Sequence, residues 1–142
     1  MTARRFADSN ILLYAISTAP EERAKSAIAL ELLEDPELAL SVQVLQEFYV
    51  QATRSGKPDR IRHAQAEALV ESWLRFPVQE TTVALLLAAM EARDHYRLSY
   101  WDAAVIEAAR MMGCREVLTE DLSHGADYGG IVVVNPFRRK SP

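Results

Sequence analysis

The chain has 142 residues, of which 49% are hydrophobic and 25% are charged, and its formal net charge at pH 7 is −4. This length fits one domain with a sizeable buried core, and the composition is ordinary for a globular protein. The negative charge argues against a protein that holds nucleic acid by bulk electrostatics alone, and the longest uninterrupted apolar stretch, 83–90, is far shorter than the ~20 residues that cross a bilayer.

The cysteine content and the first residues indicate the compartment. Cys114 is the single cysteine, so no intramolecular disulfide can form and a reducing environment is expected. The polar residues 8–10 interrupt the apolar run that follows Arg4 and Arg5, which argues against an export signal. We therefore expect a cytoplasmic protein that does not enter a membrane.

Strands and helices are predicted to alternate from the start of the chain. A short strand over 4–7 runs into Asp8-Ser9-Asn10, which favours the start of a helix. Pro20 opens a second helix, and Asp35-Pro36 ends it. Ser41 is placed to cap a third helix after a second strand.

The second half of the chain continues the alternation. The segment 83–95 is apolar on nearly every side and is predicted to be a central, buried helix. Ser99 caps the last helix, which Gly113 ends, and 131–135 is a β-branched run typical of a strand buried on both faces. The predicted strands are 4–7, 38–41, 76–80, 114–119 and 131–135, and the predicted helices are 11–16, 20–34, 42–53, 59–75, 83–95 and 100–112.

This order of elements predicts the fold class. Alternating βα units with short connections favour an α/β three-layer sandwich, with a mostly parallel five-stranded sheet flanked by helices. Residues 1–142 are expected to form one domain, and 138–142 a flexible polar tail. Basic residues are grouped in this tail and in the segment 54–62. They either form a basic rim around an acidic site or belong to an ordinary solvated surface.

Four acids fall where this topology brings elements together. Asp8 and Asp121 each follow a strand, and ligands of open parallel sheets sit beyond the carboxyl ends of strands. Asp102 lies in the first turn of its helix, and Glu47 lies about two turns into the helix after the second strand. All four are therefore expected at one edge of the sheet.

Each acid also has an ordinary explanation. A helix N-terminus favours Asp8 and Asp102 by ~0.3–1 kcal/mol each, Asp121 suits a turn, and Glu47 falls nearly opposite the apolar stripe of its helix. Their joint placement favours a metal site, because clustered carboxylates raise one another's pKa unless a cation neutralises them. Oxygen ligands of this kind suit Mg²⁺ or Mn²⁺.

Five segments resemble one family, in the same order along the chain. They are 6–14 (FADSNILLY), 41–47 (SVQVLQE), 100–104 (YWDAA), 118–122 (LTEDL) and 134–137 (VNPF). Together they resemble the PIN-domain ribonucleases, in particular the VapC-type toxins of toxin–antitoxin systems. The resemblance implies a PIN-like fold and a Mg²⁺-dependent endoribonuclease, usually a homodimer, that a small VapB-type antitoxin neutralises by occluding the active site.

The resemblance also implies the site residues. Asp8, Glu47 and Asp102 match the three principal acids, and Asp121 matches a more variable fourth. Glu120 stands beside Asp121, so that either could face the metal. The small polar residues that match supporting positions are Ser9, Asn10 and Thr119. Asp127 is a weaker candidate, because its Gly-containing surroundings indicate a loop.

A mechanism follows from such ligands. One or two metal ions held by Asp8, Asp102 and Asp121 would bind a phosphate oxygen and lower the pKa of bound water, while Glu47 would hold a metal through water or orient the nucleophile. The histidines do not form an acid/base pair, and His124 is a minor candidate for a general base. Trp101 is interpreted as a core or dimer-contact residue, with base stacking as the alternative.

The sequence disfavours two other function classes. A haloacid-dehalogenase-type phosphatase needs a second Asp where Asn10 stands, and a receiver domain needs a lysine where the chain has Asn135 and Pro136. The open alternatives are a PIN nuclease for RNA maturation or DNA structures, and a non-catalytic protein-binding module. The target RNA, its cleavage sequence, the number of metal ions and the oligomeric state are not encoded in any recognisable pattern.

Overall fold

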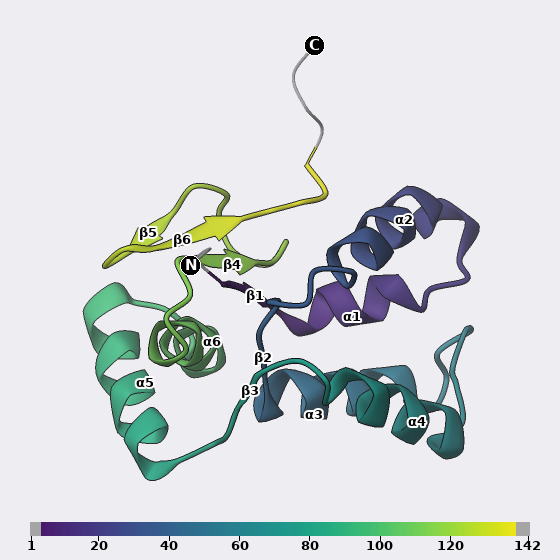
Figure 1. Cartoon of the computed structure of the whole chain (residues 1–142), viewed down its shortest axis with the longest axis horizontal. Coiled ribbons are helices and arrows are strands. Elements are labelled where there is room, and N and C mark those ends of the chain that lie inside the picture. The colour runs from purple at the N-terminus through teal and green to yellow at the C-terminus, as the bar shows by residue number, and fades with distance from the viewer. Residues whose placement is uncertain (1–3, 139–142) are drawn as a thin grey trace.

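The computed structural model describes residues 4–138. The strands are β1 (Arg5–Ala7), β2 (Leu40–Ser41), β3 (Val78–Gln79), β4 (Glu116–Leu118), β5 (Asp127–Tyr128) and β6 (Ile131–Val134). The helices are α1 (Ser9–Ala15), the 3-10 turn η1 (Pro20–Glu22), α2 (Arg23–Leu32), α3 (Val42–Ala52), α4 (His63–Trp73), α5 (Val83–Tyr96) and α6 (Tyr100–Met111). The helices contact one another in pairs, α1 with α2, α3 with α4 and α5 with α6, and lie below and beside the strands β4, β5 and β6 in the view of Figure 1. Residues 139–142 of the predicted tail lie outside the described residues.

The α/β class with a mostly parallel sheet is confirmed, but the predicted single five-stranded sheet is divided. One sheet has the order β1-β4-β6-β5, in which only β5 is antiparallel, and β2 pairs with β3 in a second, parallel ladder. A single bridge between Phe6 and Ala39 links the two. The second ladder is short because Ser41 already caps α3, so the chain leaves the strand at once.

The strand β5 is absent from the sequence prediction, which placed a loop there. It forms a hairpin with β6 across Gly129 and Gly130, both at positive φ, where side chains other than glycine are strained. Asp127 accepts a hydrogen bond from the backbone N–H of Gly130 at 2.7 Å. Asp127 is therefore a turn residue of this hairpin.

Helix caps agree with the prediction at Ser41 and Ser99, whose hydroxyls each accept a hydrogen bond from the N–H three residues on. Two starts differ. The first helix begins at Ser9, because Asp8 itself is the cap, and α4 begins at His63 and not at residue 59. The loop before α4 contains turns and an ion pair between Lys57 and Asp59.

The prediction that 83–95 is a central, buried helix is wrong. Helix α5 contacts mainly α6, and its buried residues are a stripe of Leu85, Ala89 and Ala92. Val83 and Leu87 on its other sides are 71% and 59% exposed, because no described element covers them. The buried helix is α6, in which every residue from Ala103 to Ala109 is buried.

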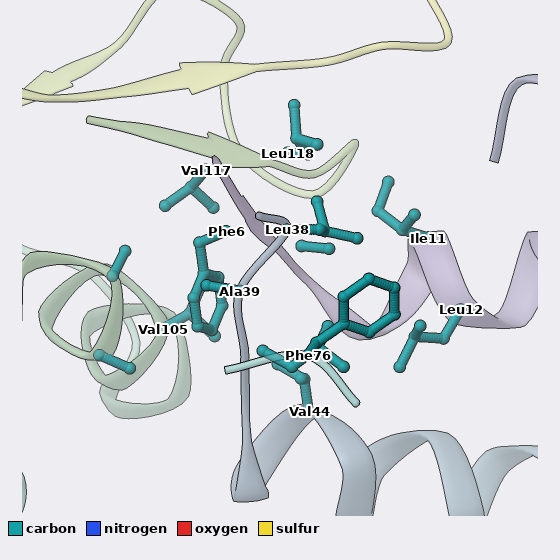
Figure 2. Close-up of a cluster of buried hydrophobic side chains, with 14 of the residues drawn as sticks. Phe6, Ile11, Leu12, Leu38, Ala39, Val44, Phe76, Val105, Val117 and Leu118 are labelled. Atoms are coloured by element: carbon teal, nitrogen blue, oxygen red, sulfur yellow. The ribbon is translucent and has the colours of Figure 1, made fainter. Parts of the chain in front are cut away.

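The core runs between β1, β4 and helices α1, α3 and α6 (Figure 2). Phe6 and Leu118 fill its centre, on the two strands whose carboxyl ends lead toward the predicted site. On β6, burial alternates: Ile131 and Val133 are buried, and the other two valines are half-buried. The expectation of burial on both faces is therefore wrong.

Cys114 is buried and free, just before β4. Within 4–138, no helix is both long and apolar enough to cross a membrane.

Candidate active site

The parallel pairing of β1 with β4 brings two predicted site segments together. Ala7 lies opposite Leu118, and the N–H of Asp8 donates to the carbonyl of Leu118 at 3.0 Å. The next residue on β4's side, Thr119, is therefore beside Asp8. Both residues are held by the core, because Asp8 is 6% exposed and Thr119 is fully buried.

Both carboxylate oxygens of Asp8 have partners. The Ser9 N–H donates to Oδ1 at 2.8 Å, and the hydroxyl of Thr119 donates to Oδ2 at 2.9 Å. The first contact comes from the start of α1, where a carboxylate cap is favourable. The Asp8 carboxylate therefore has one fixed orientation at the junction of strand and helix.

Thr119 also connects Asp8 to Asp121. Its Oγ1 accepts hydrogen bonds from Asn10 Nδ2 at 3.0 Å and from the backbone N–H of Asp121 at 3.1 Å. With one donated and two accepted bonds, the hydroxyl has no capacity left. Asn10 Nδ2 also donates to Asp121 Oδ2 at 3.2 Å, whereas the buried Asn10 Oδ1 has no hydrogen-bond partner in the described structure.

Electrostatic effects join all four acids into one cluster. The pKa of Asp8 is raised to about 6, mainly by burial and also by the charges of Asp121 and Asp102, against the hydrogen bonds from Ser9 and Thr119, which lower it. Burial likewise raises the pKa of Glu47 to about 6, with added contributions from the charges of Asp8, Asp102 and Asp121. We name Asp8, Glu47, Asp102 and Asp121 the acid cluster.

The chemistry of the acid cluster fits a divalent cation. Its four carboxylates offer the oxygen ligands that Mg²⁺ and Mn²⁺ take, and their mutual repulsion is what a cation would relieve. Across 4–138, no three His, Cys, Asp or Glu side chains lie close enough to hold a metal ion as they stand. Binding would therefore require the acid side chains to move closer together.

Glu120 differs sharply from its neighbour. Its carboxylate accepts hydrogen bonds from Tyr14 Oη and, at 2.9 Å, from the ammonium of Lys25. Lys25 neutralises this charge, whereas Asp121 is bonded to Asn10 and raises the pKa of both Asp8 and Glu47. The geometry favours Asp121 over Glu120 as the fourth member of the site.

A cleft of about 570 Å³ lies beside the acid cluster. Ser9 and Asn10 line it from α1, Glu47 from α3, and Trp101 from the first turn of α6. The sequence analysis missed Gln43, whose Nε2 donates to Glu47 Oε1 at 3.3 Å and to the Trp101 carbonyl at 3.2 Å. Its position four residues before Glu47, on the same face of α3, is a signal that the sequence does contain.

The weaker candidates lie in structural roles. His124 Nδ1 accepts the backbone N–H of Asn135 at 3.0 Å, and His63 bonds the Tyr49 hydroxyl. Asp127 belongs to the hairpin turn described above. Trp101 is 63% exposed, so a core role is wrong, while a dimer contact and base stacking both stay predictions.

Comparison with protein-family models gives one match. The model of the PIN domain matches residues 5–124, a range that contains every member of the acid cluster. Among curated proteins, none matches the sequence at a significant level.

Solved structures with similar folds come from several bacteria. VapC20 of Mycobacterium tuberculosis, described as a toxin that cleaves the sarcin-ricin loop, is 22% identical, with a TM-score of 0.64 over 82% of this chain and 91% of its own. A toxin–antitoxin complex from Klebsiella pneumoniae is 22% identical, with a TM-score of 0.69 over 97% and 100%. FitAcB from Neisseria gonorrhoeae is 15% identical, with a TM-score of 0.68 over 95% and 99%. At these identities the likeness establishes the fold.

Proposed function

Because this chain belongs to the PIN domain family, we propose that it is a Mg²⁺-dependent endoribonuclease that acts as the toxin of a VapBC-type toxin–antitoxin pair. The observation that carries the proposal is the acid cluster, in which α3, α6 and the segment after β4 each contribute a carboxylate near the buried Asp8. A protein-binding scaffold would gain nothing from this repulsion, and a non-catalytic module is therefore disfavoured.

The residues of the cluster have distinct proposed roles. Asp8, Asp102 and Asp121 hold the cation directly, and Glu47 holds it through water or orients the attacking water. When bound, the cation supplies positive charge to a phosphate oxygen and acidity to a water molecule. Gln43 already occupies Glu47 Oε1, which leaves Oε2 for a water.

The supporting residues act by fixing the acids. Thr119 donates to Asp8, and Asn10 donates to Asp121, so both carboxylates are oriented by hydrogen bonds before a cation or a substrate binds. Ser9 fixes the second oxygen of Asp8 through its backbone N–H. Glu120 is proposed to fix the loop after β4 through Lys25, without a role as a ligand.

An RNA substrate is supported by the description of VapC20 as a toxin that cleaves the sarcin-ricin loop. The alternatives are an RNA-maturation nuclease or a nuclease for DNA structures. Nucleases of these kinds would use the same acid cluster, so they are distinguished from a toxin by the substrates that the protein cleaves.

A small VapB-type antitoxin is the proposed protein partner, as in the toxin–antitoxin complex from Klebsiella pneumoniae. An apolar groove of about 650 Å³ lies between α3 and α4, lined by Leu45, Val70 and Leu74 among others. Gln46 and Val50 line both this groove and the acidic cleft, so the two are adjacent. A partner helix in the groove could therefore place an Arg side chain among the carboxylates.

Three further parts of the proposal concern organisation. One hydrophobic cluster joins both halves of the described chain, which supports a single nuclease domain over 1–142. The exposed apolar side chains Val83, Leu87 and Met90 on α5 support a homodimer. The buried, free Cys114 is consistent with action in the reducing cytoplasm.

Incubation of the purified protein with mixed RNA tests the proposal directly. We expect cleavage with Mg²⁺ or Mn²⁺ and none with EDTA, and growth arrest on expression that a cognate antitoxin relieves. Cleavage that persists in EDTA would contradict a metal-dependent site. Active enzyme whose expression is harmless would favour the maturation nuclease.

A further inference from the structure

Trp101 is an exposed aromatic residue beside the acid cluster. The chain contains two tryptophans, of which Trp73 is 4% exposed in the core and Trp101 is 63% exposed. Trp101 lies in the first turn of α6, next to Asp102, and lines the same cleft as Glu47 and Asp121. A large apolar side chain at this position keeps much of its surface in contact with water.

The backbone of Trp101 is fixed at the edge of the cleft, and its indole contacts a neighbouring ring. Gln43 Nε2 donates to the Trp101 carbonyl at 3.2 Å and to Glu47 Oε1 at 3.3 Å, which links the aromatic residue to the acid cluster. The ring of Tyr100 contacts it edge-to-face, with centroids 4.9 Å apart and an interplanar angle of 89°. An edge-to-face contact covers at most one face of the indole, so at least one face remains for a ligand.

The charge of the cleft limits what can hold a nucleic acid there. Glu47 and Asp121 line the cleft, Asp8 and Asp102 act on it electrostatically, and the whole chain has a net charge of −4. Phosphates are repelled by these carboxylates unless a cation lies between them. A substrate strand at this site therefore gains from an anchor that does not depend on positive charge.

We propose that Trp101 is a stacking platform for an unpaired base of a single-stranded RNA bound in the cleft. This inference rests on the proposed nuclease function and names the form of the substrate. Aromatic side chains bind single strands in this way, because every base has an aromatic face whereas a paired base is covered by its neighbours. A base on Trp101 places the adjoining phosphodiester near the acid cluster, since Trp101 lines the same cleft as Glu47 and Asp121.

Binding of short oligouridylate and oligoadenylate tests the proposal in EDTA, where metal-dependent cleavage is absent. We expect quenching of tryptophan fluorescence in the wild-type protein and no quenching in Trp101→Phe, because Trp73 is buried. Trp101→Ala should weaken binding, measured with labelled RNA, by about 5- to 150-fold, and Trp101→Phe by less. The loss should be the same at low and moderate salt, because stacking releases no counterions. Val83→Ala, an exposed apolar side chain on α5, is the matched control and should bind normally.

Three results would overturn the stacking role. Normal RNA affinity of Trp101→Ala, in a preparation whose wild type cleaves RNA with Mg²⁺, removes the subsite and leaves the nuclease function intact. A shift of Trp101→Ala from dimer to monomer in sedimentation, with unchanged RNA affinity, assigns Trp101 to a contact between two copies. A wild-type protein that neither binds nor cleaves RNA refutes the nuclease function together with the subsite.

Discussion

The replacement Asp8→Asn should leave the metal-free protein at least as stable as the wild type at pH 8. Asp8 is 6% exposed, and its pKa rises from 3.8 to about 6 in the folded protein. A difference of about 2 pKa units corresponds to about 3 kcal/mol by which ionised Asp8 destabilises the fold above pH 6. Asn removes this charge with almost no change in volume.

The gain from Asn is partly offset. The carboxylate accepts hydrogen bonds from Ser9 and Thr119, and an amide oxygen can replace it for only one of them with good geometry. A hydrogen bond to a charged group contributes about 1.5–3 kcal/mol, so the net change at pH 8 lies between roughly zero and 1.5 kcal/mol in favour of Asn.

The sign of the pH dependence follows from the raised pKa. Folded Asp8 takes up its proton below about pH 6 and the unfolded chain only below about pH 4, so the wild type gains stability as pH falls from 7 to 4. Asp8→Asn lacks this gain. The difference in unfolding free energy between the two proteins should therefore change by about 3 kcal/mol across this range, or by roughly 10 °C in melting temperature.

Thermal melts in EDTA between pH 4 and 8 measure this difference, with Asp94→Asn, an exposed acid on α5, as the matched control. Added Mg²⁺ should then raise the melting temperature of the wild type far more than that of Asp8→Asn, because a ligand stabilises in proportion to its affinity for the folded state. The reasoning is refuted if Asp8→Asn melts well below the wild type at pH 8 and Mg²⁺ shifts both equally.

Five other substitutions, in three tests, examine the site in RNA-cleavage and melting assays. Asp102→Asn should abolish cleavage and keep the fold, whereas Asp127→Asn should change cleavage little. A larger loss of cleavage in Asp127→Asn than in Asp102→Asn would show that the site is assigned to the wrong acids. Asp121→Asn should reduce cleavage at least about tenfold, since it removes a charge from the cluster, while Glu120→Gln should retain most of it; a larger loss at Glu120 would make Glu120 the fourth ligand. Thr119→Val removes a buried hydroxyl with three hydrogen bonds, so it should lower the unfolding free energy by about 1–3 kcal/mol. It should also weaken the stabilisation by Mn²⁺. Unchanged stabilisation by Mn²⁺ would show that Thr119 does not orient the acids.

Local signals in the sequence were sufficient where one residue determines the structure. Ser41 and Ser99 cap their helices as predicted, and the polar residues after the first strand begin a helix. The approach of Asp8 to Asp121 was also predictable, because parallel strands end at the same edge of a sheet. These features depend on hydrogen bonds within a few residues or on topology alone.

The errors arise where neighbouring elements decide the outcome. Helix α5 is as apolar in sequence as a buried helix, yet only α6 covers it, and the sequence does not say how many sides of a helix have neighbours. The pairing of Glu120 with Lys25 spans 95 positions and distinguishes Glu120 from Asp121, which are adjacent in sequence. Trp101 was misassigned to the core for the same reason, since its exposure depends on what packs beside the first turn of α6.

The position of Asp8 explains why the site can tolerate its own repulsion. An ionised, buried carboxylate that costs about 3 kcal/mol takes a substantial part of a typical stability of 5–15 kcal/mol. Asp8 lies directly after β1, between fully buried Phe6 and Ile11, and the saturated hydroxyl of Thr119 holds it from β4. The surrounding core therefore keeps the Asp8 carboxylate in place when no cation is bound, and we expect a cation that draws the other carboxylates toward Asp8 to offset part of this cost. We therefore expect the proposed cofactor Mg²⁺ to stabilise the fold as well, whereas acids that served only as caps and turns would show neither effect.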